Sequence, residues 1–175
     1  YGDVHISFGQ PIYLDEMLDD RDQDWRETFA GKESRARWVN SLIDALGQQI
    51  MRNINASADV NPVNLLAVAM LATPKLRIDE QDLLAQLSLY RQLLLTGPFA
   101  DTISITEREG YAIIDHGLAL GLLERREHSL GDILALAPDS ASGLTYFRNN
   151  VTHLFAIPSL VACCLLNQQQ CPMAQ

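Results

Sequence analysis

The chain has 175 residues, of which 47% are hydrophobic, so it is long enough to bury a core as one domain or as two small ones. Its 22 acidic residues outnumber its 13 basic ones, and the net charge of −9 argues against a nucleic-acid binder, because phosphate contacts need clustered lysine and arginine. The three cysteines, Cys163, Cys164 and Cys171, are too few for a disulfide framework and have no histidine at zinc spacing. We therefore expect buried, reduced thiols and neither a metal nor a cofactor.

The first residues alternate between apolar and polar side chains. Val4, Ile6 and Phe8 would lie on one side of a half-buried strand, which a turn at residues 9–11 closes. Because no second strand follows nearby, we expect this strand to pair with a sheet upstream, and the missing initiator methionine predicts a fragment. The acidic run at residues 14–25 is typical of a solvated surface segment, irregular or briefly helical.

Helical periodicity replaces this alternation further along the chain. Between residues 33 and 54 the apolar positions recur every three or four residues, which predicts an amphipathic helix. Asn61 and Pro62 are typical of an N-cap and a first helical residue. The helix that they begin is apolar nearly all round and should end before Pro74, so we expect it to lie buried at the centre of its domain.

Residues 75–138 have the element order of a winged-helix unit. Asp79 should cap one helix, and Thr106 with Glu109 forms a capping-box pattern ahead of a second. Gly121 can end that second helix, and two short strands around a polar turn follow it. The order helix, helix, hairpin therefore predicts a small winged-helix-like α/β hairpin subdomain.

A winged helix often binds DNA, but the charge of this one does not support that function. The candidate recognition helix, residues 107–120, has Arg108 as its only basic side chain apart from His116. Contacts to phosphates and bases would be nearly absent, so a structural or protein-contact role is the better interpretation. In the hairpin, His128 and Asp132 could form an acid–base pair, but exposed groups would couple weakly, and we interpret them as turn residues.

The last part of the chain, from about residue 141, is predicted to be helical and broken or kinked at Pro158. It has no acidic residue, and Arg148 is its only charged side chain. Its longest apolar stretch, residues 154–166, is about 13 residues long, whereas a membrane-spanning helix needs roughly 18 or more. The sequence therefore predicts no transmembrane segment.

On a helical wheel, the residues before Pro158 divide into two faces. Apolar side chains form a core-facing stripe of Leu144, Phe147, Val151, Leu154 and Phe155. Amides, hydroxyls, an imidazole and one guanidinium lie opposite, on Thr145, Arg148, Asn149, Thr152 and His153. Such groups suit directed hydrogen bonds in a confined place. Two interpretations stay open: this face is buried against another domain that pairs a carboxylate with Arg148, or Arg148, Asn149 and His153 contact an anion such as phosphate.

Four stretches resemble one enzyme family. YFRNNVTHLFAIPSL, residues 146–160, resembles a signature of the long bacterial membrane-bound glycerol-3-phosphate acyltransferases. VHISFGQPI, residues 4–12, resembles the strand and turn that close their acyltransferase domain. NPVNLLAVAMLATP at residues 61–74 and LGDILALAP at residues 130–138 follow in the family's order and spacing, so the resemblance covers most of the chain.

This resemblance implies transfer of a fatty acyl group from acyl-CoA or acyl-carrier protein to the sn-1 hydroxyl of glycerol 3-phosphate. The reaction belongs to phospholipid biosynthesis and takes place at the cytoplasmic face of the bacterial inner membrane. The family's catalytic motif is His-x-x-x-x-Asp, in which the aspartate orients a histidine that acts as general base. None of the four histidines of this chain has an aspartate five positions later, so no catalytic residue carries over and the chain alone is expected to be inactive.

We therefore expect a mainly α, C-terminal portion of such an enzyme. Residues 1–13 would form the last strand of the upstream α/β acyltransferase sheet, residues 14–74 a helical region, 75–138 the winged-helix-like subdomain and 139–175 a C-terminal helical segment. The missing catalytic domain would bind the substrates, the parent protein would contact the membrane surface, and nucleic acid would not be a partner. The alternative is a non-enzymatic winged-helix module that binds a protein.

Overall fold

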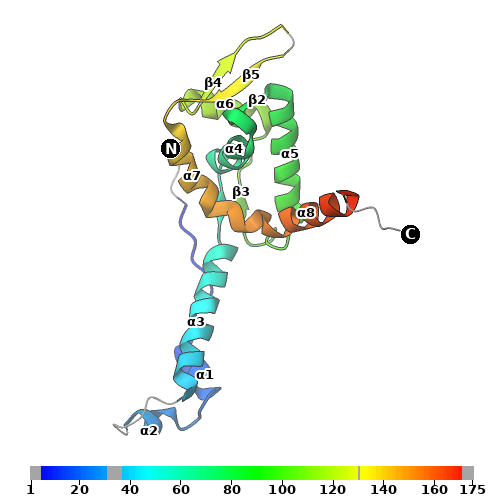
Figure 1. Cartoon of the computed structure of the whole chain (residues 1–175). Coiled ribbons are helices and arrows are strands. Elements are labelled where there is room, and N and C mark those ends of the chain that lie inside the picture. The colour runs from blue at the N-terminus through cyan, green and yellow to red at the C-terminus, as the bar shows by residue number, and fades with distance from the viewer. Residues whose placement is uncertain (1–4, 31–36, 130, 171–175) are drawn as a thin grey trace, which may run out of the picture. The chain divides into compact units, whose positions relative to one another are not determined.

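The structure is a computed structural model that describes residues 5–30, 37–129 and 131–170 (Figure 1). Helices make up most of these residues and the strands are short, which confirms the mainly α prediction. The chain divides into two compact units. Residues 6–57 belong to the first, and His5 with the described residues from Ala58 onward belongs to the second.

The first unit begins without regular secondary structure. Residues 6–13 form no strand, and the side chains of Ile6 and Phe8 are 72% and 94% exposed. A strand needs a second strand to pair with, and none of the described strands pairs with this segment. Its pairing with a sheet outside this chain stays a prediction. The acidic run at residues 14–25 forms one short surface helix, α1 (Leu14–Asp19), as expected, and a second, α2 (Trp25–Ala30), begins at its last residue.

Helix α3 (Arg37–Ala56) confirms the predicted amphipathic helix, and residues 33–36 of that prediction lie outside the described residues. Leu42 is buried, whereas Ile43, Ile50 and Ile54 are exposed. These three isoleucines recur at intervals of seven and four residues, so they lie on one face of the helix. Helix α3 therefore keeps an apolar face that the described residues of its own unit do not cover.

Helix α4 (Pro62–Ala72) is the centre of the second unit. Leu65, Leu66 and Met70 are completely buried, and further helices pack against α4, namely α5 (Glu80–Thr96), α6 (Gly110–Ala119) and α7 (Ser140–Val151). The start of α4 confirms the predicted cap. Asn61 Oδ1 accepts a hydrogen bond from the backbone N–H of Asn64 at 3.1 Å, and Asn64 Oδ1 accepts one from the N–H of Asn61 at 3.0 Å.

A three-stranded antiparallel sheet packs beside these helices. Its strand order is β2-β5-β4, with Ile78 opposite Leu134 and Leu134 opposite Arg125. The strands are β2 (Arg77–Asp79), which follows the 3-10 helix η1 (Pro74–Leu76), then β4 (Leu123–Arg126) and β5 (Ile133–Leu136). The predicted hairpin is therefore present as β4 and β5. A separate parallel pair joins β1 (Asp59–Val60) to β3 (Ser104–Ile105).

The caps of α5 and α6 differ in how well the sequence predicted them. Asp79 caps α5, because its Oδ1 accepts from the N–H of Gln81 at 2.8 Å. The capping box predicted for α6 is wrong. Glu109 occupies the N-cap position without a side-chain cap bond, since its carboxylate pairs with Arg91, and Thr106 Oγ1 accepts from the N–H of Arg108 at 3.2 Å.

Helix α7 continues through the 3-10 helix η2 (Thr152–Phe155) into α8 (Ala156–Gln170). The departure from α-helical geometry therefore lies before Pro158, not at it as predicted. Pro158 is in the first turn of α8, where its missing N–H leaves no intrahelical bond unmade. The predicted core stripe is confirmed, with four of its residues buried and Phe147 half-buried.

The run from Ser140 to Asn167 is, among the described residues, the one helix long and apolar enough to cross a membrane by length and composition. It is longer than the apolar stretch on which the prediction of no span depended, because α7, η2 and α8 follow one another directly. Cys163 and Cys164 of α8 are free, as expected, but both are exposed, so the prediction that they are buried is wrong. Cys171 lies outside the described residues.

Candidate functional site

The polar face predicted around Arg148 is partly exposed in this chain. Asn149 and Thr152 are exposed, and Thr145, Arg148 and His153 are half-buried. The guanidinium of Arg148 donates to Asn149 Oδ1, at 3.1 Å from Nη2 and 3.4 Å from Nε, and Thr152 Oγ1 donates to the carbonyl oxygen of Arg148 at 2.8 Å. In the described part of the chain, no ion pair involves Arg148. Its charge is therefore held in place by a neighbouring amide and stays available to an anion or a carboxylate.

The structure places His153, the third residue proposed for this site, in η2 just after the end of α7. Its ring lies edge-on to Phe99, with 6.0 Å between the ring centroids, and its side chain is half-buried. The inner side of the same segment is fixed by a long-range contact, since Nδ2 of the buried Asn64 donates to the carbonyl oxygen of Phe147 at 2.8 Å. The segment thus has one side bound to the core and one side exposed.

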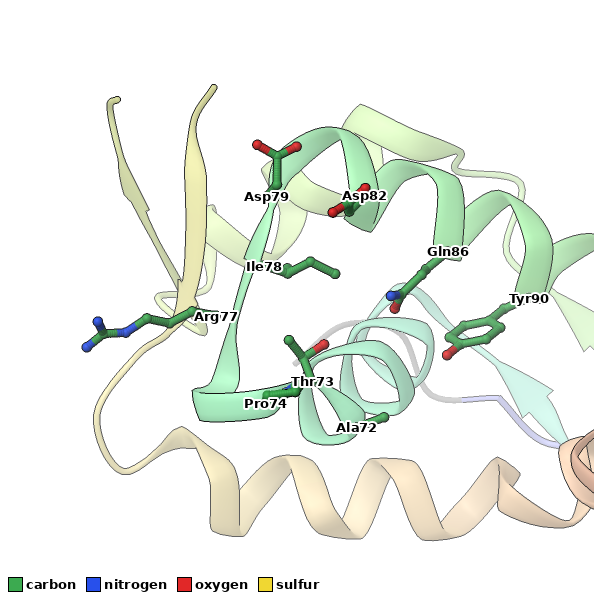
Figure 2. A pocket seen from close by; sticks show the side chains of 9 residues that line it. All are labelled: Ala72, Thr73, Pro74, Arg77, Ile78, Asp79, Asp82, Gln86 and Tyr90. Atoms are coloured by element: carbon green, nitrogen blue, oxygen red, sulfur yellow. The ribbon is translucent and has the colours of Figure 1, made fainter. Parts of the chain in front are cut away.

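A hollow of about 580 Å³ lies between the end of α4, strand β2 and helix α5 (Figure 2). Figure 2 shows Gln86 and Tyr90 extending from α5 toward the end of α4, where Thr73 lies. Burial raises the pKa of Tyr90, so its phenol stays protonated at neutral pH and can donate a hydrogen bond. Asp79 and Thr73 already bond the backbone, Asp79 as the cap of α5 and Thr73 through the carbonyl oxygen of Ala69 at 2.9 Å. Among the described residues that line the hollow, no hydrogen bond pairs a nucleophilic side chain with a base.

The structure brings together a histidine, an aspartate and a serine that no sequence pattern grouped. His5 Nδ1 lies 3.8 Å from Asp59 Oδ1, and Ser104 Oγ donates to the same carboxylate oxygen. A nucleophilic triad needs the histidine between the serine and the aspartate, so that the imidazole can take the hydroxyl proton. Here the aspartate is in the middle. The cluster therefore links the start of the second unit to the β1–β3 pair and does not activate the serine.

A second charged cluster joins the hairpin to the start of α5. Arg125 Nη2 lies 2.5 Å from Glu80 Oε1, and Arg125 Nη1 lies 3.4 Å from Asp132 Oδ2. Glu80 is only 8% exposed, although it is a charged residue at the first position of a helix. Asp132 thus pairs with an arginine, and the backbone of the His128 turn closes through the N–H of Gly131 at 3.1 Å. This geometry fits turn residues with a structural ion pair.

The surroundings of His116 lower the pKa of its imidazole. Burial lowers the pKa of His116 on α6, and the nearby charge of Arg108 lowers it further. His116 is therefore neutral at pH 7 and adds no positive charge to the helix that would read DNA. Among the residues that the structure describes, no group of three or more histidine, cysteine, aspartate or glutamate side chains could hold a metal ion.

The fold defines a helical region with exposed contact surfaces, a small hollow and charged clusters that join neighbouring elements. The model of the family described as the glycerol-3-phosphate acyltransferase C-terminal region matches residues 1–175. The chain belongs to this family.

Proteins named glycerol-3-phosphate acyltransferase are similar to nearly the whole chain. The one from Xanthomonas axonopodis pv. citri (strain 306) is 42% identical over 170 residues, which cover 97% of this chain and 19% of the relative. The one from Xylella fastidiosa (strain M23) is 41% identical, covering 97% of this chain and 20% of the relative. The one from Pseudomonas fluorescens (strain SBW25) is 41% identical, and the match covers 93% of this chain and 19% of the relative. The chain therefore spans about a fifth of the length of the curated relatives that it matches.

Proposed function

We propose that this chain is a structural and docking region of a glycerol-3-phosphate acyltransferase and does not catalyse acyl transfer alone. The parent enzyme transfers a fatty acyl group from acyl-CoA or acyl-carrier protein to the sn-1 hydroxyl of glycerol 3-phosphate, in phospholipid biosynthesis. The family match along residues 1–175 is the observation on which this proposal depends. The lack of His-x-x-x-x-Asp in these 175 residues supports the non-catalytic role, because the glycerol hydroxyl needs a general base.

The proposed location is the cytoplasmic face of the bacterial inner membrane, where water-soluble substrates meet a lipid product. The test is an assay of glycerol-3-phosphate-dependent release of CoA from palmitoyl-CoA, with the full-length protein and this chain measured side by side. We expect an active full-length protein and a silent chain. A silent full-length protein in phospholipid vesicles would contradict the enzymatic assignment, and an active chain would contradict the docking role.

We also propose that the polar face of α7 contacts the catalytic part of the parent enzyme or an anionic group that it binds. The support is the position of Arg148, which is fixed by Asn149 and pairs with no carboxylate in the described part of this chain. In the full-length protein, Arg148→Ala should weaken anion binding, and Arg148→Lys should recover only part of it, because lysine cannot make a bidentate contact. Unchanged binding of glycerol 3-phosphate in both variants would leave only the interdomain role.

A second candidate function, a winged-helix module that binds a protein partner, is favoured by the topology from α4 to β5. Apart from the 3-10 helix η1 and strand β3, which pairs with β1, its element order is helix, strand, helix, helix, strand, strand, and its sheet order is β2-β5-β4. We propose that this part of the chain is winged-helix-like and makes protein contacts. Helix α6 has no lysine or arginine, so a DNA duplex is not its partner. Two results together would favour this function over the acyltransferase role: a protein partner binds the chain, and the full-length protein shows no acyl transfer.

A further inference from the structure

Helix α8 exposes large apolar side chains to solvent between Ala156 and Asn167. From Ala156 to Asn167 every side chain is exposed except that of Pro158, which is half-buried. Five large aliphatic residues in this stretch are between 53% and 65% exposed, namely Ile157, Leu160, Val161, Leu165 and Leu166. Figure 1 shows α8 extending from the end of α7 away from α4. Because these five aliphatic residues lie on several sides of the helix, α8 is apolar nearly all round.

A lipid bilayer is a poor match for this surface. Helix α8 has 15 residues, which at about 1.5 Å per residue are roughly 22 Å long, shorter than the ~30 Å hydrocarbon core of a membrane. The longer run from Ser140 does not add a free span, because Leu144 and Val151 of α7 are buried in the core of the unit. A helix lying in the membrane interface needs a polar face, usually with lysine or arginine, and α8 has no charged residue.

The net charge gives the same result. The chain carries a net charge of −9, which opposes contact with anionic phospholipid headgroups. A helix that is apolar on all sides is typical of the interior of a larger protein. The chain spans only 19–20% of the length of its relatives, so a full-length acyltransferase has ample further polypeptide to cover α8.

We propose that the apolar surface of α8 is a docking surface for another part of the same full-length acyltransferase, and that the occupant is an uncharged, aliphatic protein surface. Helix α8 then becomes a core helix of the whole enzyme, while α7 remains a core helix of this unit. This inference rests on the proposed function, because it takes the chain to be part of a full-length acyltransferase.

Two native thiols report directly on this contact, since Cys163 and Cys164 both lie on α8 and both are free and exposed. The experiment measures their rate of maleimide labelling by peptide mass spectrometry, first in this chain and then in the full-length protein. We expect fast labelling in the chain. In the full-length protein the labelling rate should be lower by at least about tenfold, because a packed contact protects the thiols. Equal rates in the two would overturn the proposal.

A pair of matched variants tests whether α8 itself makes the contact. In the full-length protein, Leu160→Glu with Leu165→Glu should restore fast labelling, because two buried carboxylates would oppose docking. The control is Leu89→Glu with Leu95→Glu on α5, where the leucines are similarly exposed in this chain, and it should leave the thiols protected. Both double variants should leave the circular dichroism of the isolated chain unchanged. An equal effect of the control pair would contradict the assignment to α8.

The remaining outcomes identify a different occupant and would also overturn the proposal. Protection of the isolated chain by phosphatidylethanolamine–phosphatidylglycerol vesicles would indicate lipid. Slow labelling of the chain in buffer, reversed by Leu160→Glu with Leu165→Glu, would indicate a second copy. Acyl transfer is measured separately on the unmodified full-length protein, so loss of the proposed function and loss of the proposed contact are distinguished.

Discussion

Asn64 is the one polar residue of α4, and its substitution tests how this unit is held together. Its side chain is 2% exposed and makes two hydrogen bonds in opposite directions. Oδ1 accepts from the N–H of Asn61 at 3.0 Å, and Nδ2 donates to the carbonyl oxygen of Phe147 at 2.8 Å. The first bond caps α4, and the second joins α4 to α7 across 83 residues of sequence.

The expected magnitude follows from these two bonds. Each contributes about 1 kcal/mol, and a partner left unbonded away from water adds to the loss. Asn64→Ala should therefore lower the free energy of unfolding by about 2–3 kcal/mol. For a chain of this length, 1 kcal/mol corresponds to roughly 2–4 °C in Tm. Urea unfolding followed by circular dichroism at 222 nm measures the first quantity, and thermal unfolding checks the second.

Two further variants make the test specific. Asn61→Ala removes only the other half of the cap and should lower the free energy of unfolding by about 1 kcal/mol. Asn150→Ala, on the exposed side of α7, should change it by less than ~0.5 kcal/mol. If Asn64→Ala were no more destabilising than Asn61→Ala, the bond to Phe147 would contribute nothing, and the account of how α4 holds α7 would be refuted.

Three other predictions concern packing, charge and pH. Gly117→Ala should lower the free energy of unfolding by about 1–3 kcal/mol, because the new methyl group would lie 2.6 Å from a buried leucine of α4. The control, Gly143→Ala, places its methyl group where no atom lies within 4 Å, so it should be neutral or stabilising. Urea unfolding of both variants separates the effect of crowding from that of helix propensity. Arg125→Met should be destabilising by about 1–3 kcal/mol, because it leaves Glu80 without its ion pair, and adding Glu80→Gln should reverse much of the loss in a double-mutant cycle. The pKa of His116 is lower in the folded than in the unfolded chain, so stability should fall as the pH drops below about 6.5, and His116→Gln should reduce that fall when unfolding is compared across the range.

The elements that the sequence predicted correctly are those with a local signal. Asn61 and Pro62 mark the start of α4, and Asp79 marks the start of α5, because each side chain or ring acts on its own turn of helix. The two faces of α7 also follow from local periodicity, since the buried stripe needs only the 3.6-residue repeat.

The elements that it missed depend on contacts between distant residues. Strands β1 and β3 are two residues each and lie about 45 residues apart, so no alternation pattern can indicate them. Glu80 is buried beside Arg125 of β4, which lies 45 residues further along the chain. Likewise, Glu109 could have completed the predicted capping box, but its ion pair with Arg91 of α5 competes for the carboxylate. A tertiary contact overrode the local preference in each of these cases.

The mixture of polar and apolar residues in YFRNNVTHLF, residues 146–155, is explained by its position at the edge of the core. On its inner side, Val151, Leu154 and Phe155 are buried and Phe147 binds Asn64. On its outer side Asn149, Asn150 and Thr152 are exposed, and from Ala156 to Asn167 no residue is buried. One short segment therefore ends the packing of this unit and begins the exposed surface for which we propose a docking role. Inner substitutions should then destabilise the chain by itself, whereas outer substitutions should have an effect only in the full-length protein.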